Sequence, residues 1–176
     1  MAVSLLCFII LSLFMIHEFD EIIFTRPWIE QNQTDKRYQK ELFIARKESY
    51  PSAESLAFMI AEEFVLAILL LLVSIGTQSF ELALATGFAH TLHLFGHIAQ
   101  VLKFKRWVPG GLTAVATLPI LLIVFSVYMF QYPVAWPLLL TLSVVIMIFL
   151  VTNLLFLQKQ VRNFQRFIYW MTKAEK

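Results

Sequence analysis

The sequence predicts an all-α membrane bundle of five transmembrane helices. Hydrophobic residues make up 59% of the 176 positions, and charged residues make up only 15%. A soluble domain of this size could not bury so much apolar surface. The apolar residues fall into five segments of about 20 residues, the length of helix that crosses a hydrocarbon core. Because backbone polar groups must be satisfied internally there, we expect each segment to be a helix.

The five segments form one membrane domain over residues 1–176. The first has no basic residues before it and no small-residue cleavage pattern after it, so we interpret it as a span and not as a signal peptide. The cytosolic loop at 25–55 contains a short amphipathic pattern (Tyr38, Leu42, Ala45), typical of a helix lying on the membrane or of a solvated one. The expected spans are 2–24, 56–75, 80–102, 112–131 and 134–157.

The orientation follows from the basic residues, which favour the cytosolic side. All 14 Lys and Arg residues lie in the loop at 25–55, in the connection after the third span or after the fifth span. The turns at 76–79 and 132–133 have none. We therefore expect the N-terminus outside and the C-terminus in the cytosol. These cations fit contact with anionic membrane lipids, and we expect no nucleic-acid partner.

Ionisable residues inside spans are costly, so each needs a reason. On the third span, the spacing of three histidines places them on one stripe about 60° wide. On the first span, a histidine and two carboxylates share a face, whereas Glu18 lies off it. Of the adjacent Glu62 and Glu63, at most one points squarely inward, and Glu81 is interpreted as interfacial. The residues that share faces are His90, His93 and His97, and His17, Asp20 and Glu21.

These groups are also expected at one depth. Counted from the cytosolic ends of their spans, His17, Glu62 and His93 lie roughly 8–14 Å beneath the cytosolic boundary, at 1.5 Å per helical residue. Chance placement on three helices would scatter them. The sequence therefore predicts a buried site of histidines and carboxylates between the first three helices.

Several chemistries fit such a site. Imidazoles with carboxylates are ligands for zinc or non-haem iron, in mononuclear or dinuclear sites. The same groups serve metal-free acid/base catalysis, a proton or cation pathway, or a polar network that only specifies helix packing. We favour a metal site and expect catalytic roles for Asp20 and Glu63. The expected metal ligands are His17, Glu21, Glu62, His90, His93 and His97.

The motifs resemble one known family. His17-Glu18-Phe19-Asp20-Glu21 is similar to the motif of the HXXEE family of small bacterial integral membrane proteins, with Asp20 in place of the first Glu of that motif. The resemblance continues through Glu62-Glu63 and the histidine segment to Trp107–Ala114. The second motif of the family is Asn-Ala-x-x-His, which His93 matches, whereas His90 stands where Ala is expected. The resemblance makes His93 a firmer candidate than His90, and it implies no reaction.

The predicted function is a membrane metalloenzyme that acts on a lipid or another small apolar substrate, by hydrolysis or by iron-dependent oxidation. The alternatives are a metal-free acid/base isomerase and a transporter of protons or divalent cations. A transporter needs a polar path to the outer face, and the outer halves of the first three spans are mainly apolar. The sequence leaves the metal, its nuclearity, the substrate and the oligomeric state open.

Overall fold

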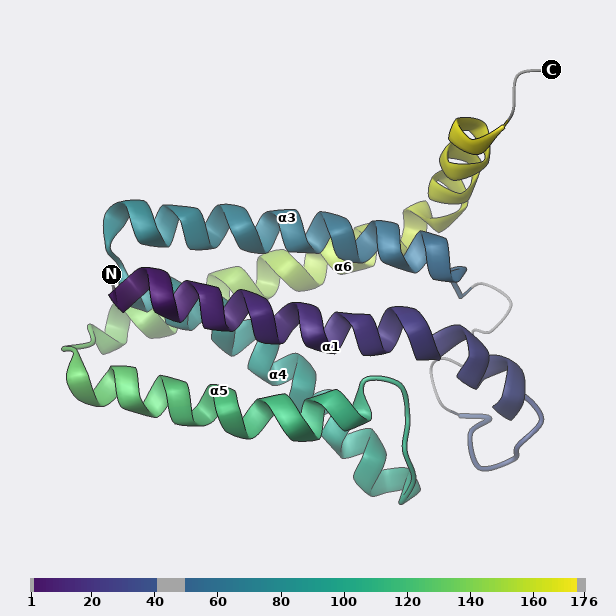
Figure 1. The fold of residues 1–176 in the computed structure, drawn as a ribbon, viewed down its shortest axis with the longest axis horizontal. Helices are drawn as coiled ribbons and strands as arrows, with labels where there is room; N and C mark the ends of the chain where they lie inside the picture. The colour runs from purple at the N-terminus through teal and green to yellow at the C-terminus, as the bar shows by residue number, and fades with distance from the viewer. Residues whose placement is uncertain (1, 41–49, 174–176) are drawn as a thin grey trace.

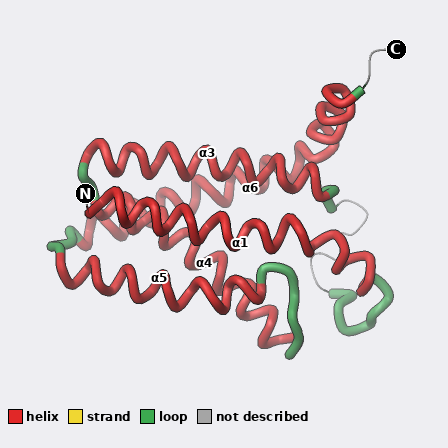
Figure 2. The backbone as a smooth tube through the Cα atoms, in the orientation of Figure 1, coloured by secondary structure: helices red, strands yellow, loops and turns green. Residues whose placement is uncertain are grey.

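The computed structural model describes residues 2–40 and 50–173, and the regular structure within them is entirely helical (Figures 1 and 2). The predicted all-α class with five long helices is confirmed. The bundle places its N-terminus at the end opposite the loop that follows the first helix (Figure 1). The helices are α1 (Ala2–Asn32), α3 (Ala53–Thr77), α4 (Phe80–Phe104), α5 (Gly111–Gln131) and α6 (Trp136–Thr172).

Two helices, α1 and α6, extend furthest beyond the expected spans. Helix α1 continues through Pro27 to Asn32, because its last turns bury Trp28 and Ile29 against Tyr38. Helix α6 continues past residue 157, where Phe164 still packs on α3, and its C-terminal end then points away from the bundle (Figure 1). Tyr38 lies in the turn after α1. The other positions of the short helix expected there fall at 41–49, outside the described residues.

Serine caps define two of the helix starts. The Ser52 side chain accepts a hydrogen bond from the Ser55 amide at the start of α3, and the Ser79 side chain accepts one from the Leu82 amide at the start of α4. Each cap satisfies an amide that lacks a partner inside its own helix. The tight turn between α3 and α4 brings these two helices side by side, as the expected outer turn requires.

Helix α4 is the central helix, since it contacts each of the other four. Small residues on its buried faces allow close approach. A side chain on Gly87, for example, would meet the Phe125 ring of α5 at 2.5 Å and the Ile10 side chain at 3.1 Å. The other four helices are each long and apolar enough to cross a membrane. The histidines lower the mean hydropathy of α4. The surrounding helices cover this helix.

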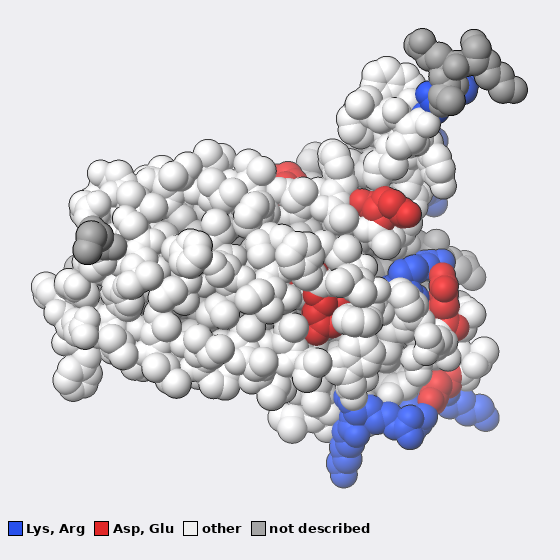
Figure 3. Space-filling view, viewed as in Figure 1, with Lys and Arg blue, Asp and Glu red and all other residues white. Residues whose placement is uncertain are grey.

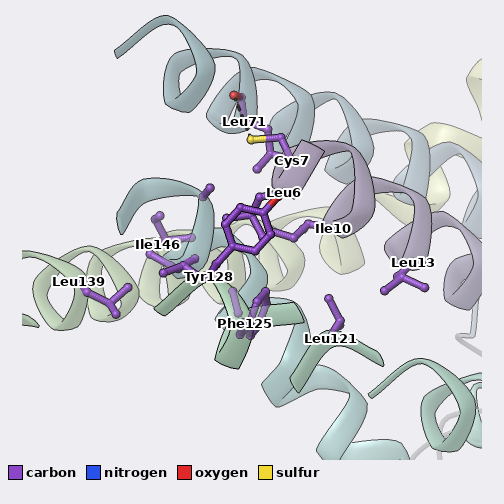
Figure 4. Packing of buried hydrophobic residues seen from close by; sticks show 14 of the residues in the cluster. Leu6, Cys7, Ile10, Leu13, Leu71, Leu121, Phe125, Tyr128, Leu139 and Ile146 are labelled. Carbon is purple, nitrogen blue, oxygen red and sulfur yellow. Dashed lines mark hydrogen bonds between the residues drawn. The ribbon is translucent and has the colours of Figure 1, made fainter. Parts of the chain in front are cut away.

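The apolar core fills the half of the bundle near the N-terminus (Figure 4). Leu6 and Ile10 of α1, Leu71 of α3 and Phe125 of α5 pack there at 3% exposure or less. The hydroxyl of Tyr128 donates a hydrogen bond to the Ala2 carbonyl at 3.0 Å.

The charged side chains gather at the opposite end. Figure 3 shows Lys and Arg where α1 ends, whereas most of the remaining surface on this face carries no charge. In the turn after α1, Arg37 forms an ion pair with Asp35 and hydrogen-bonds it through both its backbone amide and its side chain. The Arg37 hydrogen bonds lower the pKa of the Asp35 carboxyl to about 2.

Candidate metal site

Two helices supply four ligand atoms that meet beneath the charged end of the bundle. His17 and Glu21 lie one turn apart on α1, and His93 and His97 lie one turn apart on α4. Residues at i and i+4 share a helix face, so each helix presents two ligands to the other. One atom from each of the four side chains lies within 4.8 Å of all the others. This group could hold a metal ion.

The distances between the ligand atoms fit one small cation. From Glu21 Oε1, the Nε2 atoms of His97, His93 and His17 lie at 2.6, 3.5 and 3.8 Å. The Nε2 atoms of His93 and His97 are 3.1 Å apart. Ligands at zinc-like bond lengths stand about 3.3 Å apart in a tetrahedron. Some of the observed distances between ligand atoms are shorter than that spacing and others are longer, so small side-chain shifts would be enough to bind a metal ion.

Hydrogen bonds at Nδ1 orient the imidazole rings of His17 and His97 so that the Nε2 atom of each ring faces Glu21. His97 Nδ1 lies 3.0 Å from the Pro109 carbonyl, which can only accept, so this nitrogen carries a proton. His17 Nδ1 lies 3.0 Å from the Thr113 hydroxyl. Such outer partners are the usual means of fixing a metal-binding tautomer. Both Nε2 atoms therefore face the carboxylate and are the nitrogens that a metal ion would use, and His17 Nε2 is buried without a hydrogen-bond partner.

Asp20 lies behind His17 and outside the four-atom group. The Thr113 hydroxyl donates to Asp20 Oδ2 at 2.8 Å, and the Thr113 amide donates to the same oxygen at 3.3 Å. A hydroxyl has one proton, so a Thr113 that donates to Asp20 accepts from His17 Nδ1. The structure thus links the expected catalytic Asp20 to His17 through a residue at the start of α5.

A glycine in the loop before α5 lies against the two histidines. Gly110 has φ +75°, a left-handed conformation that favours glycine. A Cβ atom there would lie 2.6 Å from His97 Nδ1 and 3.1 Å from His17 Cε1. This close approach lets the Pro109 carbonyl reach His97, so the loop 107–110 forms one wall of the site.

The other predicted site residues surround the group without joining it. The His90 ring lies 5.6 Å from that of His17, and its Nε2 atom is buried with no hydrogen-bond partner. Glu63 lines the adjacent cavity. Glu62 accepts a hydrogen bond at 2.8 Å from Asn153 of α6, so the structure does not bring this expected ligand to the group.

Helical spacing predicts that Glu18 lies outside the site, whereas the fold brings it into the site. Its side chain is only 4% exposed and lines the cavity beside Glu21. The reason is that α1 contacts α3, α4 and α5. A helix enclosed on several sides buries more than one face, so His17, Glu18, Asp20 and Glu21 are all buried. In the sequence, the signal that Glu18 belongs to the site was its position among adjacent ionisable residues in one span.

A cavity of about 640 Å³ opens beside the group and lies between α1, α3, α4 and α6. That volume is within the range of small-molecule binding sites. Leu70, Met147 and Leu150 line an apolar part of it. His93 is the exposed ligand and lines the cavity, so a molecule inside could reach a bound metal. The polar lining contains Glu18, Glu21, Glu63, His90, His93 and His97.

Comparison with known proteins identifies one relationship. A family model described as a protein of unknown function with HXXEE motif matches residues 8–124, more than half of the chain. No curated protein matches, and no solved structure matches. The matched range includes all four grouped ligands together with Gly110 and Thr113.

Proposed function

The chain belongs to the HXXEE family, whose function is unknown, and from its site we propose that it is a membrane metalloenzyme acting on a lipid or another apolar substrate. One observation carries this proposal. Hydrogen bonds at Nδ1 orient the rings of His17 and His97. Their Nε2 atoms converge with the imidazole of His93 on one carboxylate oxygen of Glu21. Lone pairs facing a carboxylate repel one another unless a cation or proton lies between them.

The roles of the residues follow from their positions. His17, Glu21, His93 and His97 would hold the ion, and Thr113 and Pro109 orient two of the rings. A bound zinc ion supplies an activated water for hydrolysis, whereas a bound iron ion supports oxidation by oxygen. Glu63 lines the cavity and would accept or donate a proton at the substrate. The same residues allow one ion, or two if Glu63 and His90 contribute.

The runner-up is a metal-free isomerase, which the 2.6 Å contact between Glu21 Oε1 and His97 Nε2 favours. A carboxylate and an imidazole at that distance share a proton and could transfer it to a substrate. A transporter is less well supported, because the described residues that pack in the other half of the bundle are mainly apolar.

Elemental analysis of the purified protein separates these functions. We expect a stoichiometric zinc or iron content after purification without chelators, and we expect His93→Ala to lose most of it. A wild-type protein with no transition metal would leave the acid/base function as the better proposal.

The hydroxyl between His17 and Asp20 provides a sharper test. Thr113→Val removes it while keeping the shape of the side chain, and loss of such an outer partner typically weakens metal binding about 10–100-fold. Thr117→Val is the matched control, because the Thr117 hydroxyl donates only to the Thr113 carbonyl in the same helix. Equal metal affinity in the two variants would exclude Thr113 as an orienting residue.

We further propose that the protein lies in the bacterial cytoplasmic membrane with its charged end in the cytosol, as the positive-inside rule requires. Single cysteines at Ser79 and Val134, in a Cys7→Ala background, should react with an impermeant thiol reagent added to intact cells. A cysteine at Gln33 should not react. Labelling only at Gln33 would reverse the orientation.

A further inference from the structure

The cavity has two chemically distinct parts. Leu70, Met147 and Leu150 contribute only hydrocarbon and sulfur surface, whereas the part near the ligands contains glutamates and histidines. Exposed apolar side chains, including Leu92 and Val151, also line it. A molecule that fits has an apolar chain and one polar head, and it can enter from the lipid.

The charge of the lining restricts that head. Three glutamates, Glu18, Glu21 and Glu63, line the cavity, and the lining residues in the described part of the chain include no Lys or Arg. Neither Glu18 nor Glu63 has a hydrogen-bond or ion-pair partner among residues 2–40 and 50–173. Whether or not a glutamate keeps its proton, it supplies no positive charge. An anionic head would therefore lie beside glutamates, with no Lys or Arg among the described lining residues to pair with it, which is costly in free energy.

A single bound divalent ion does not reverse this preference, because its two positive charges do not exceed the charge that three carboxylates can carry. Neutral imidazole ligands add nothing to this balance. Within the described part of the chain Glu18 and Glu63 have no hydrogen-bond partner at the cavity wall, and a hydroxyl or ammonium head would supply one.

We propose that the ligand of this cavity is an amphiphile with a long apolar chain and a head that donates hydrogen bonds and carries no negative charge, such as a long-chain alcohol or amine. Lipids with a phosphate or carboxylate head are excluded. This inference rests on the proposed function, because it names the class of substrate for the same site.

Three photoreactive probes with the same long alkyl chain test the inference. Their heads are an ammonium, a hydroxyl and a phosphate, and the wild-type protein is held in nanodiscs of neutral lipid. We expect the ammonium and hydroxyl probes to label the α3 and α6 segments that line the cavity at least about tenfold more than the phosphate probe does. Labelling of the segment around Phe130, which is 96% exposed, corrects for unequal partitioning into the lipid.

Two variants locate the effect. Ala67→Trp places a large ring in the apolar part of the cavity and should abolish specific labelling by all probes while leaving the metal content unchanged. Glu18→Gln combined with Glu63→Gln should weaken labelling by the ammonium probe, because both carboxylates that could pair with it are removed, and should change labelling by the hydroxyl probe little. If the double variant misfolds, the comparison of the three probes on the wild-type protein still tests the inference.

The possible failures are distinguishable. Equal labelling of the cavity by the phosphate and ammonium probes would overturn the inference, whatever the metal content. A wild-type protein that lacks metal but keeps the expected order of heads would overturn the proposed metalloenzyme and support the charge argument, since that argument depends on the glutamates.

Discussion

Replacing Gly110 by alanine should damage the metal site more than the fold. The left-handed conformation costs an alanine about 1–2 kcal/mol, and a new atom 2.6 Å from His97 Nδ1 adds an overlap of the kind that costs about 1–3 kcal/mol. The nearest atoms belong to the His97 ring, so much of the strain falls on a ligand. If about 1.4 kcal/mol of it is expressed as displacement of that ring, metal affinity falls about tenfold.

The assay is a competition titration of purified Gly110→Ala with a chromogenic chelator, with helical content measured by circular dichroism. Gly111→Ala is the steric control, because its new atom would meet Val101 at 2.5 Å and neither histidine. Gly96→Ala is the neutral control on α4, since nothing lies within 4 Å of its added atom. Wild-type metal affinity in a folded Gly110→Ala protein would refute the close approach of the loop to the site.

Three further predictions concern single side chains. Glu21→Gln should weaken metal binding at least about tenfold, whereas Glu62→Gln, which is engaged with α6, should change it little; equal losses would place both carboxylates on the metal. His90→Ala should retain most of the bound metal by elemental analysis, unless a second ion is present. Asp35 should titrate near pH 2 by NMR, and Arg37→Gln should raise its pKa toward 3.8, so any stabilisation from this exposed pair is present above about pH 4 and lost as the pH falls toward 2.

Much of the fold follows from the sequence because a membrane limits the choices. Apolar segments of sufficient length must form helices, and the basic residues fix which ends share a side. The extension of α6 beyond residue 157 does not follow, because it depends on Phe58 and Phe164 meeting across two helices. Contacts of that kind are set by tertiary packing, which a count of apolar residues does not contain.

The candidate site was predictable where both ligands of a pair lie on one helix. The four-residue spacing alone brings His17 to Glu21 and His93 to His97. Glu62 shows the limit of this reasoning, because its depth matches that of the site but the rotation of α3 directs it toward Asn153. Spacing gives relative angles within a helix, and it gives no information on which neighbour each face meets.

The loop before α5 shows the same limit in another form. Pro109, Gly110 and Thr113 entered the sequence analysis only as part of the segment that carries the family resemblance. Their role depends on a carbonyl and a hydroxyl that reach histidine rings in two other helices. A turn motif predicts the local backbone geometry and not what the turn packs against.

The placement of the buried carboxylates argues that the cluster is more than a packing device. Isolated ionisable groups in a membrane are costly, and a network kept only for packing should have its groups paired. Here His17 Nε2 and His90 Nε2 are buried without partners, and Glu18 and Glu63 border an open cavity. A divalent ion held by three imidazoles and Glu21 would retain one surplus positive charge, which a carboxylate at Glu18 or Glu63 would balance. The proposed ion and polar ligand together would give each of these groups a partner, which helix packing alone does not do among the described residues.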